Sequence, residues 1–262
     1  MPSLQDRFLS GYPVLQRLGR ADAQGVPVPS EMINRVAPDL WRMIGEACFG
    51  VIWNRPGLTL EQRSMSTISV ISALRRDDNL RGHVESGLDV GLTPTEIVEM
   101  IIQIFYYVGA PIANTALGIA NSVFEERGLT VEPIRVFDIE EKPESLLERG
   151  RAKRAEVLGD LGPGSAAAVD QEWDQYVLEY LWGSVWTRPG LDTISRMVCT
   201  LSVLPLVGTN RSLRDHIRGA RRIGMTEEQI NEIFFHLTFY TGESIARHAR
   251  VIARETFAKE QS

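Results

Sequence analysis

The chain contains two copies of one sequence module. The run FGVIWNRPGL, which begins at residue 49, returns 133 positions later as WGSVWTRPGL. Without a gap, 21 of the 66 aligned pairs between residues 49–114 and 182–247 are identical, including Trp, Pro, Gly and His pairs. Solenoid repeats have periods of roughly 20–50 residues, so this longer period is domain-sized. The sequence therefore predicts two tandem domains, residues 1–134 and 135–262.

Helix-start signals recur in both copies. Thr59, Thr93 and Thr226 are each followed three residues later by Glu or Gln, which is the capping-box pattern, and Asp192 is a further N-cap candidate. No run alternates with period two over a length that would indicate a sheet. An all-α fold is expected in each copy. Residues 1–28 are rich in Gly and Pro, and we expect an irregular arm with one helical turn, either wrapped on a neighbouring subunit or loosely ordered.

The composition excludes several classes of protein. The net charge of −6 argues against nucleic-acid binding, which needs a basic face. The longest apolar segment, residues 97–108, contains Glu99 and Gln103 and is too short to cross a membrane. Two cysteines are too few for a disulfide framework, and no secretion signal precedes the first copy. A cytoplasmic protein that binds no nucleic acid and no membrane is expected.

His83 and His216 occupy equivalent positions and are the first chemical candidates. Each lies one turn after a leucine, so it either titrates near neutral pH beside an apolar face or only hydrogen-bonds between packed helices. Arg63 and Arg196 lie in helices of small and apolar residues. Either they bind a substrate carboxylate, or they form ion pairs with the repeated glutamates Glu99 and Glu232.

The aromatic residues and a possible metal site leave alternatives open. Trp53, Tyr106 and Tyr107 either line a pocket or belong to the core. Glu232 and His236 have i, i+4 spacing, but no complete ligand motif surrounds them, so no metal is expected. Arg55 and Arg188 follow the repeated tryptophans, where structural roles in turns are favoured.

The ordered motifs resemble the carboxymuconolactone decarboxylase family, which shares its fold with the alkylhydroperoxidase D-like proteins. In chain order these motifs are FGxxWxRPGL from Phe49, Arg63-Ser64 followed by Thr67-Ile68, LRGH ending at His83, GLTPTEIVE from Gly91, and YVGAP from Tyr107. The resemblance covers about residues 30–127 and 162–254 and identifies the chain as a two-copy member. It implies an all-helical domain that assembles into rings.

The resemblance also implies a reaction. The peroxidase branch carries a C-x-x-C ahead of the histidine, where this chain has Arg76 and Asn79 in one copy and Thr209 and Ser212 in the other, so a cysteine peroxidase is not expected. The decarboxylase branch remains, with a small anionic substrate such as 4-carboxymuconolactone and no cofactor. The implied catalytic residues are Arg63, His83 and Glu99, with Arg196, His216 and Glu232 as their equivalents. The implied substrate-binding residues are Trp53, Arg55, Tyr107, Trp186, Tyr240 and His236.

In this interpretation an arginine holds an anionic group and a histidine polarises a carbonyl or supplies a proton. We expect each site to be built within one copy, and we favour the first copy, because the second departs from the pattern at Pro205, at Gly242-Glu243-Ser244 and at the added Arg218, Arg221 and Arg222. The alternative is that the second copy is specialised, with its extra arginines and His236 serving a different substrate. The alternatives are a related decarboxylase, isomerase or lactone-processing enzyme of secondary metabolism, and a non-catalytic assembly module. Because two joined copies would replace a dimer, a homotrimer is expected, with a dimer next.

Overall fold

The protein is built from helices throughout the part that the computed structural model describes, which is residues 2–22, 31–136, 138–161 and 169–260. The first copy contains α1 (Leu4–Ser10), α2 (Tyr12–Arg17), α3 (Glu31–Val36), α4 (Pro38–Met43), the π-helix η1 (Ile44–Ile52), α5 (Leu60–Ala73), α6 (Asp77–Asp89), α7 (Pro94–Val108) and α8 (Ala110–Glu126). The second contains α9 (Pro143–Leu158), α11 (Gln171–Val177), the π-helix η2 (Leu178–Val185), α12 (Thr193–Val207), α13 (Asn210–Arg222), α14 (Glu227–His236), α15 (Thr238–Thr241) and α16 (Glu243–Glu260). The prediction of an all-α, two-copy fold is confirmed.

Side chains cap the helices where the sequence predicted. The hydroxyls of Thr59, Thr93 and Thr226 each accept a hydrogen bond from the backbone N–H three residues later, and the Gln or Glu at that position bonds back to the cap. The Asp192 carboxylate caps α12. These bonds satisfy N–H groups that have no partner inside the helix, so each start is defined by local sequence alone.

The prediction of an irregular N-terminal arm is wrong over the residues described. Helices α1 and α2 form there, and Ser3 and Asp6 make a capping box at the start of α1. Pro13 lies in the first turn of α2, where its missing N–H costs no helical hydrogen bond. Residues 23–28 of the predicted arm lie outside the described ranges.

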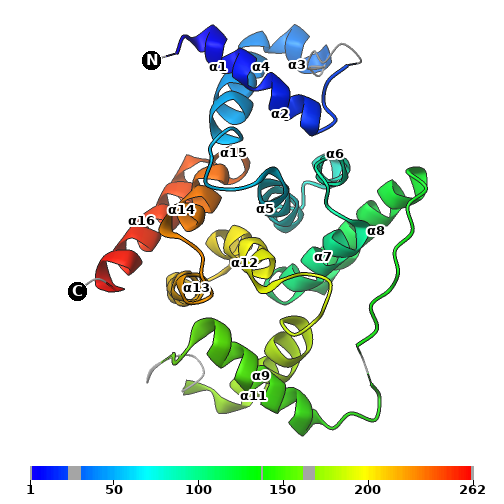
Figure 1. Ribbon diagram of the computed structural model, residues 1–262, viewed down its shortest axis with the longest axis vertical. Coiled ribbons are helices and arrows are strands. Elements are labelled where there is room, and N and C mark those ends of the chain that lie inside the picture. Colours follow the sequence, from blue (N-terminus) through cyan, green and yellow to red (C-terminus); the bar gives the residue numbers. More distant parts are fainter. Residues whose placement is uncertain (1, 23–30, 137, 162–168, 261–262) are drawn as a thin grey trace.

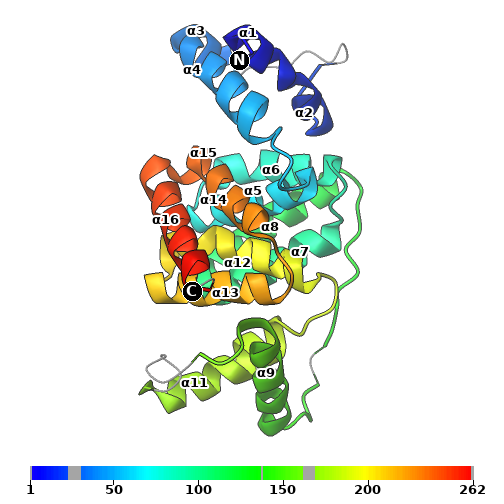
Figure 2. The same ribbon diagram turned by 60° about the vertical axis from the view of Figure 1, so that its left-hand side comes forward.

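The two copies share one hydrophobic core. Helices α5 and α12, equivalent in the repeat, pack against each other in the middle of the molecule, flanked by α6–α8 and α13–α16 (Figure 1). Ser202 Oγ donates to Ser66 Oγ across this contact at 2.8 Å. Helices α1–α4 lie at one end of the molecule and α9 and α11 at the other (Figure 2). No helix described is long and apolar enough to cross a membrane.

The π-helices η1 and η2 connect each end to the centre. Each packs closely against a helix through a repeated glycine, Gly50 in η1 and Gly183 in η2. A Cβ atom on Gly50 would lie 2.0 Å from the carbonyl oxygen of Arg7, and one on Gly183 would lie 2.2 Å from that of Leu146. Since both contacts are with backbone, only glycine fits these positions without movement of a neighbouring helix.

Candidate active site

Each repeated histidine faces a tyrosine from the other copy. The rings of His83 on α6 and Tyr240 on α15 are 5.7 Å apart, and those of His216 on α13 and Tyr107 on α7 are 5.9 Å apart. We call the place around His83 the first site and the place around His216 the second site. The expectation that each site is built within one copy is wrong, because α7 and the α14–α15 segment each pack across the pseudo-symmetric contact of α5 and α12.

The repeated glutamates also cross between copies. Glu99 of α7 pairs with Arg188 at 2.7 Å and with Arg196 at 3.1 Å, and it is almost fully buried. Arg196 Nη2 also donates to the carbonyl oxygen of Arg188 at 2.8 Å. Both arginines are therefore occupied by protein groups.

Glu232 of α14, the equivalent of Glu99 in the second copy, pairs in the same way with two arginines of the first copy. Its carboxylate accepts from Arg55 Nε at 2.7 Å and from Arg63 Nη2 at 3.2 Å. Gly57 of the repeated Arg-Pro-Gly motif makes room for it, since a Cβ there would lie 2.4 Å from the Glu232 Cγ. We call these two groups the ion triads. The repeated arginines, glycine and glutamate therefore hold the copies together, whichever further role they have.

Hydrogen bonds in the second site define the proton positions. His216 Nδ1 lies 2.8 Å from the carbonyl oxygen of Ser212, which can only accept, so Nδ1 carries the proton. His216 Nε2 then accepts from the hydroxyl of Tyr107 at 3.3 Å, and that hydroxyl accepts from Trp186 Nε1 at 3.1 Å. Burial lowers the pKa of His216 to about 4 and raises the pKa of Tyr107. Both side chains are therefore neutral at pH 7 before a ligand binds.

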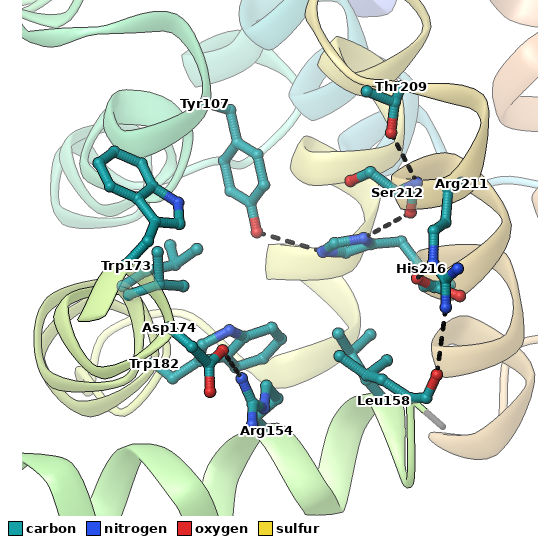
Figure 3. A pocket seen from close by; sticks show the side chains of 14 residues that line it. Tyr107, Arg154, Leu158, Trp173, Asp174, Trp182, Thr209, Arg211, Ser212 and His216 are labelled. Atoms are coloured by element: carbon teal, nitrogen blue, oxygen red, sulfur yellow. Dashed lines mark hydrogen bonds and ion pairs between the residues drawn. The ribbon is translucent and has the colours of Figure 1, made fainter. Parts of the chain in front are cut away.

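A cavity of about 230 Å³ opens beside this pair (Figure 3). Its apolar lining is Leu158, Leu161, Trp173, Val177, Leu181 and Trp182. Its charged lining is Arg154, Asp174, Arg211 and Asp215, with Thr209 and Ser212 beside His216. Drug-sized ligands occupy about 300–1,000 Å³, so a cavity of this size fits a small metabolite.

The two arginines of the cavity reach it from different elements. Arg154 of α9 is ion-paired with Asp174 of α11, and both side chains are largely buried. Arg211, in the first turn of α13, donates from Nη2 to the carbonyl oxygen of Leu161 at 3.4 Å and is about half exposed. Asp215 lies one turn further along α13, and burial raises its pKa. Asp215 also pairs with Arg211 at 3.8 Å. The cavity therefore places two arginine–aspartate pairs beside a histidine and a phenol.

The first site contains a guanidinium from the N-terminal arm. Arg20 follows α2 and donates to Ser86 Oγ at 2.9 Å, to the carbonyl oxygen of Gly82 at 3.2 Å and to His83 Nδ1 at 3.2 Å. Leu15 and Leu18 from the same arm belong to the buried cluster around Trp53. Burial, and secondarily the charge of Arg20, lower the pKa of His83 to about 3.

The two histidines consequently carry their protons on opposite nitrogens. A guanidinium only donates, so His83 Nδ1 accepts and the neutral ring is protonated at Nε2. The His216 ring is protonated at Nδ1 and offers Nε2 as an acceptor. Tyr240 accepts from Trp53 Nε1 at 3.1 Å, as Tyr107 does from Trp186, but the histidines beside these tyrosines carry their protons on different nitrogens.

His236 is buried in the first site rather than exposed to a ligand. Its Nε2 lies 2.8 Å from Thr67 Oγ1, and its ring contacts Trp53 edge-on with a centroid distance of 4.9 Å. Glu232, its i, i+4 neighbour, belongs to an ion triad. Among the described residues no group of three or more His, Cys, Asp or Glu side chains is placed to hold a metal ion.

The residues singled out from the sequence therefore divide into two groups. His216 and Tyr107 line the cavity, whereas Trp186 does not line it and donates a hydrogen bond to the Tyr107 hydroxyl. Arg55, Arg63, Glu99 and Arg196 are engaged in the ion triads, and their catalytic or binding roles stay predictions. Sequence reasoning missed Arg154, Trp173, Asp174 and Arg211. Thr209 and Ser212 line the cavity at the positions where the peroxidase branch carries its cysteines.

The chain belongs to the carboxymuconolactone decarboxylase family, whose model matches it twice, over residues 38–122 and 171–255. It is 36% identical over 104 residues to a 4-carboxymuconolactone decarboxylase from Acinetobacter baylyi, a match that covers 40% of this chain and 78% of that protein. It is 30% identical over 115 residues to a nitrosuccinic acid decarboxylase from Metarhizium robertsii, a match that covers 42% of this chain and 80% of that protein. An uncharacterised 15.0 kDa protein from Paracoccus denitrificans is 33% identical to it over 96 residues, a match that covers 36% of this chain and 72% of that protein. Each match spans about one copy of the repeat.

Proposed function

We propose that the protein is a cofactor-independent decarboxylase of a small carboxylated lactone such as 4-carboxymuconolactone, and that its chemistry takes place in the second site. The observation that carries this proposal is the cavity in which the His216–Tyr107 pair lies beside two arginines. Two of the curated relatives are named as decarboxylases, one of them acting on this lactone. This choice of the second copy differs from the expectation drawn from the sequence motifs, which favoured the first.

The reaction sets three requirements. The bond between the carboxylate carbon and its neighbour breaks, carbon dioxide leaves, and the electron pair moves onto an adjacent carbonyl or comparable acceptor. The resulting carbanion then takes up one proton, so the balanced reaction consumes a carboxylate and a proton. The protein must therefore desolvate the carboxylate, stabilise the developing oxyanion and supply the proton.

The walls of the cavity meet the first requirement. Leu158, Leu181 and Trp182 form an apolar surface against which a carboxylate loses hydration, and this loss favours its departure as neutral carbon dioxide. Arg154 is the group that would anchor a second anionic substituent. It is shared with Asp174, so a bound anion would add to an existing ion pair rather than meet a free cation.

Tyr107 and His216 are suited to the other two requirements. Because burial raises the pKa of Tyr107, its hydroxyl stays protonated and can donate to the developing oxyanion. His216 is neutral in the free protein, but a bound anion would stabilise its protonated form and raise its pKa. A proton taken from solvent by Nε2 could then pass to the carbanion. The first-site histidine lacks this option, because Arg20 leaves its Nε2 already protonated.

Internal repetition supplies matched controls for the test. We would measure carbon dioxide release from 4-carboxymuconolactone and from nitrosuccinate with wild type, Tyr107→Phe and His216→Asn, and compare Tyr240→Phe and His83→Asn. The second-site variants should lower kcat/KM by about 10²–10⁴, the range for loss of an acid or base, while the first-site variants stay near wild type. Loss confined to the first-site variants would move the chemistry to His83. No release from either acid by wild type would contradict these substrates.

A further inference from the structure

The outward face of α16 carries a row of arginines. Arg247, Arg250 and Arg254 are three and four residues apart, so their side chains lie on one face of the helix. They line a groove of about 310 Å³ together with Phe235, Thr238, Glu243 and Val251. We call this the α16 groove. None of its residues lines the His216 cavity, so it is a separate feature of the second copy.

The positive charge in the α16 groove is incompletely neutralised. Arg250 lies over the ring of Phe235 at 5.0 Å, and Arg55 lies over the same ring at 4.7 Å. Arg55 is occupied by Glu232, and Arg247 forms an ion pair with Glu243. Within the ranges that the structure describes, Arg250 and Arg254 form no ion pair, and the buried Nε of Arg250 has no hydrogen-bond partner. Two guanidinium groups therefore remain available to an anion.

Electrostatics at Arg250 agree with this arrangement. Burial lowers its pKa, and the neighbouring charges of Arg254 and Arg55 lower it further, against one opposing carboxylate, Glu232. Like charges held together without a counterion are a cost to the folded protein. An anion bound between them would remove that cost.

The first copy indicates that these arginines are not needed for packing. Its equivalent helix, α8, has Asn114, Leu117 and Asn121 where α16 has the three arginines, and Ile102 stands where α14 has Phe235. Both helices pack in the same position, α8 against α7 and α16 against α14. Since the fold forms without the arginines in one copy, their presence in the other calls for another explanation.

We infer that the α16 groove binds the phosphate group of a small molecule. Arg250 and Arg254 are one helical turn apart and can share one tetrahedral group, whose two negative charges match two unpaired guanidinium groups. A single carboxylate carries only one charge. Phe235 and Val251 provide an apolar wall for the organic part of a phosphate monoester. The inference is independent of the decarboxylation reaction.

Calorimetric titration of the full-length protein at constant ionic strength tests this inference. The ligands are inorganic phosphate and phenyl phosphate, with chloride as the reference anion. Wild type should bind one phosphate per chain saturably. The double variant Arg250→Gln/Arg254→Gln should bind phosphate at least about tenfold more weakly than wild type, as expected for the loss of charge-assisted hydrogen bonds. Its carbon dioxide release should remain at the wild-type level.

The matched control is Arg135→Gln/Arg151→Gln, which makes the same change in net charge at two exposed positions outside the groove. This variant should bind phosphate as wild type does. Equal weakening in both double variants would reduce the effect to overall charge and overturn the inference. The absence of saturable phosphate binding to wild type would also overturn the inference. Binding of the protein only to vesicles that contain phosphatidic acid would overturn it too, because it would indicate that the groove contacts a membrane surface.

Discussion

At the scale of single residues, Arg20 makes two equivalent histidines different. His83 and His216 occupy the same place in the repeat, yet Arg20 donates to His83 Nδ1 whereas His216 Nδ1 donates to Ser212. Among the described residues of the second copy, no guanidinium contacts His216 Nδ1, and the ring faces Tyr107 with an accepting Nε2. One side chain from the N-terminal arm thus decides which ring can take up a proton at Nε2.

Replacing Arg20 with methionine should reveal this control. Arg20→Met keeps most of the side-chain length but removes the positive charge, which is the second cause of the low pKa of His83. The pKa of His83 should therefore rise from about 3 toward the ordinary value, while that of His216 should remain about 4. Nitrogen-15 NMR of the histidine rings over a pH series measures both pKa values and both tautomers. An unchanged His83 would show that Arg20 does not control its ring.

At the scale of secondary-structure elements, the close packing of each π-helix against its neighbouring helix depends on a glycine. Gly50 and Gly183 allow η1 and η2 to approach the backbone of α1 and α9, and the second approach brings α9 with Arg154 to the cavity. The widened turn and the glycine recur in both copies, so they belong to the module rather than to one site.

Alanine at these glycines should destabilise the protein. Gly50→Ala and Gly183→Ala place a methyl group against a carbonyl oxygen that cannot rotate away, so each should lower the free energy of unfolding by about 1–3 kcal/mol or more. Gly118→Ala is the control, because a Cβ there has no atom within 4 Å and the position lies on the exposed face of α8. That change should raise stability by up to about 1 kcal/mol. Urea unfolding distinguishes the variants, and equal effects at all three positions would contradict the packing argument.

At the scale of the whole molecule, the ion triads and the shared core join the copies into one unit. Glu99 of the first copy pairs with arginines of the second, and Glu232 of the second pairs with arginines of the first. Each site also takes a tyrosine from the opposite copy. Neither copy therefore contains a complete site, and neither buries its α5 or α12 face alone.

Unfolding should accordingly be one cooperative transition. Glu99→Gln and Glu232→Gln each leave two arginines with an uncharged partner, and each should lower the free energy of unfolding by about 3–5 kcal/mol, the cost of breaking a buried ion pair. Both should shift the same single transition in scanning calorimetry, with equal calorimetric and van't Hoff enthalpies. Two separate transitions, each sensitive to only one variant, would mean that the copies unfold independently.

Local sequence determined much of this protein. The 133-residue offset predicts the duplication, and Thr59, Thr93, Asp192 and Thr226 start their helices where expected, because a cap acts through bonds within three residues. The family, too, could be inferred from ordered motifs along the chain. These features depend on neighbours in sequence, so they can be read without knowing how helices pack.

Tertiary structure alone decided the composition of the sites. The sequence placed Glu99 and Glu232 near arginines but left their partners open, since a repeated residue can pair within its own copy or across it. Packing of α5 on α12 selected the crossed pairing. The open cavity arose because α9 and α11 bring Arg154 and Trp173 beside His216, whereas the N-terminal arm brings Arg20 onto His83. Such contacts join residues more than 40 positions apart in sequence, and only the folded chain brings them together.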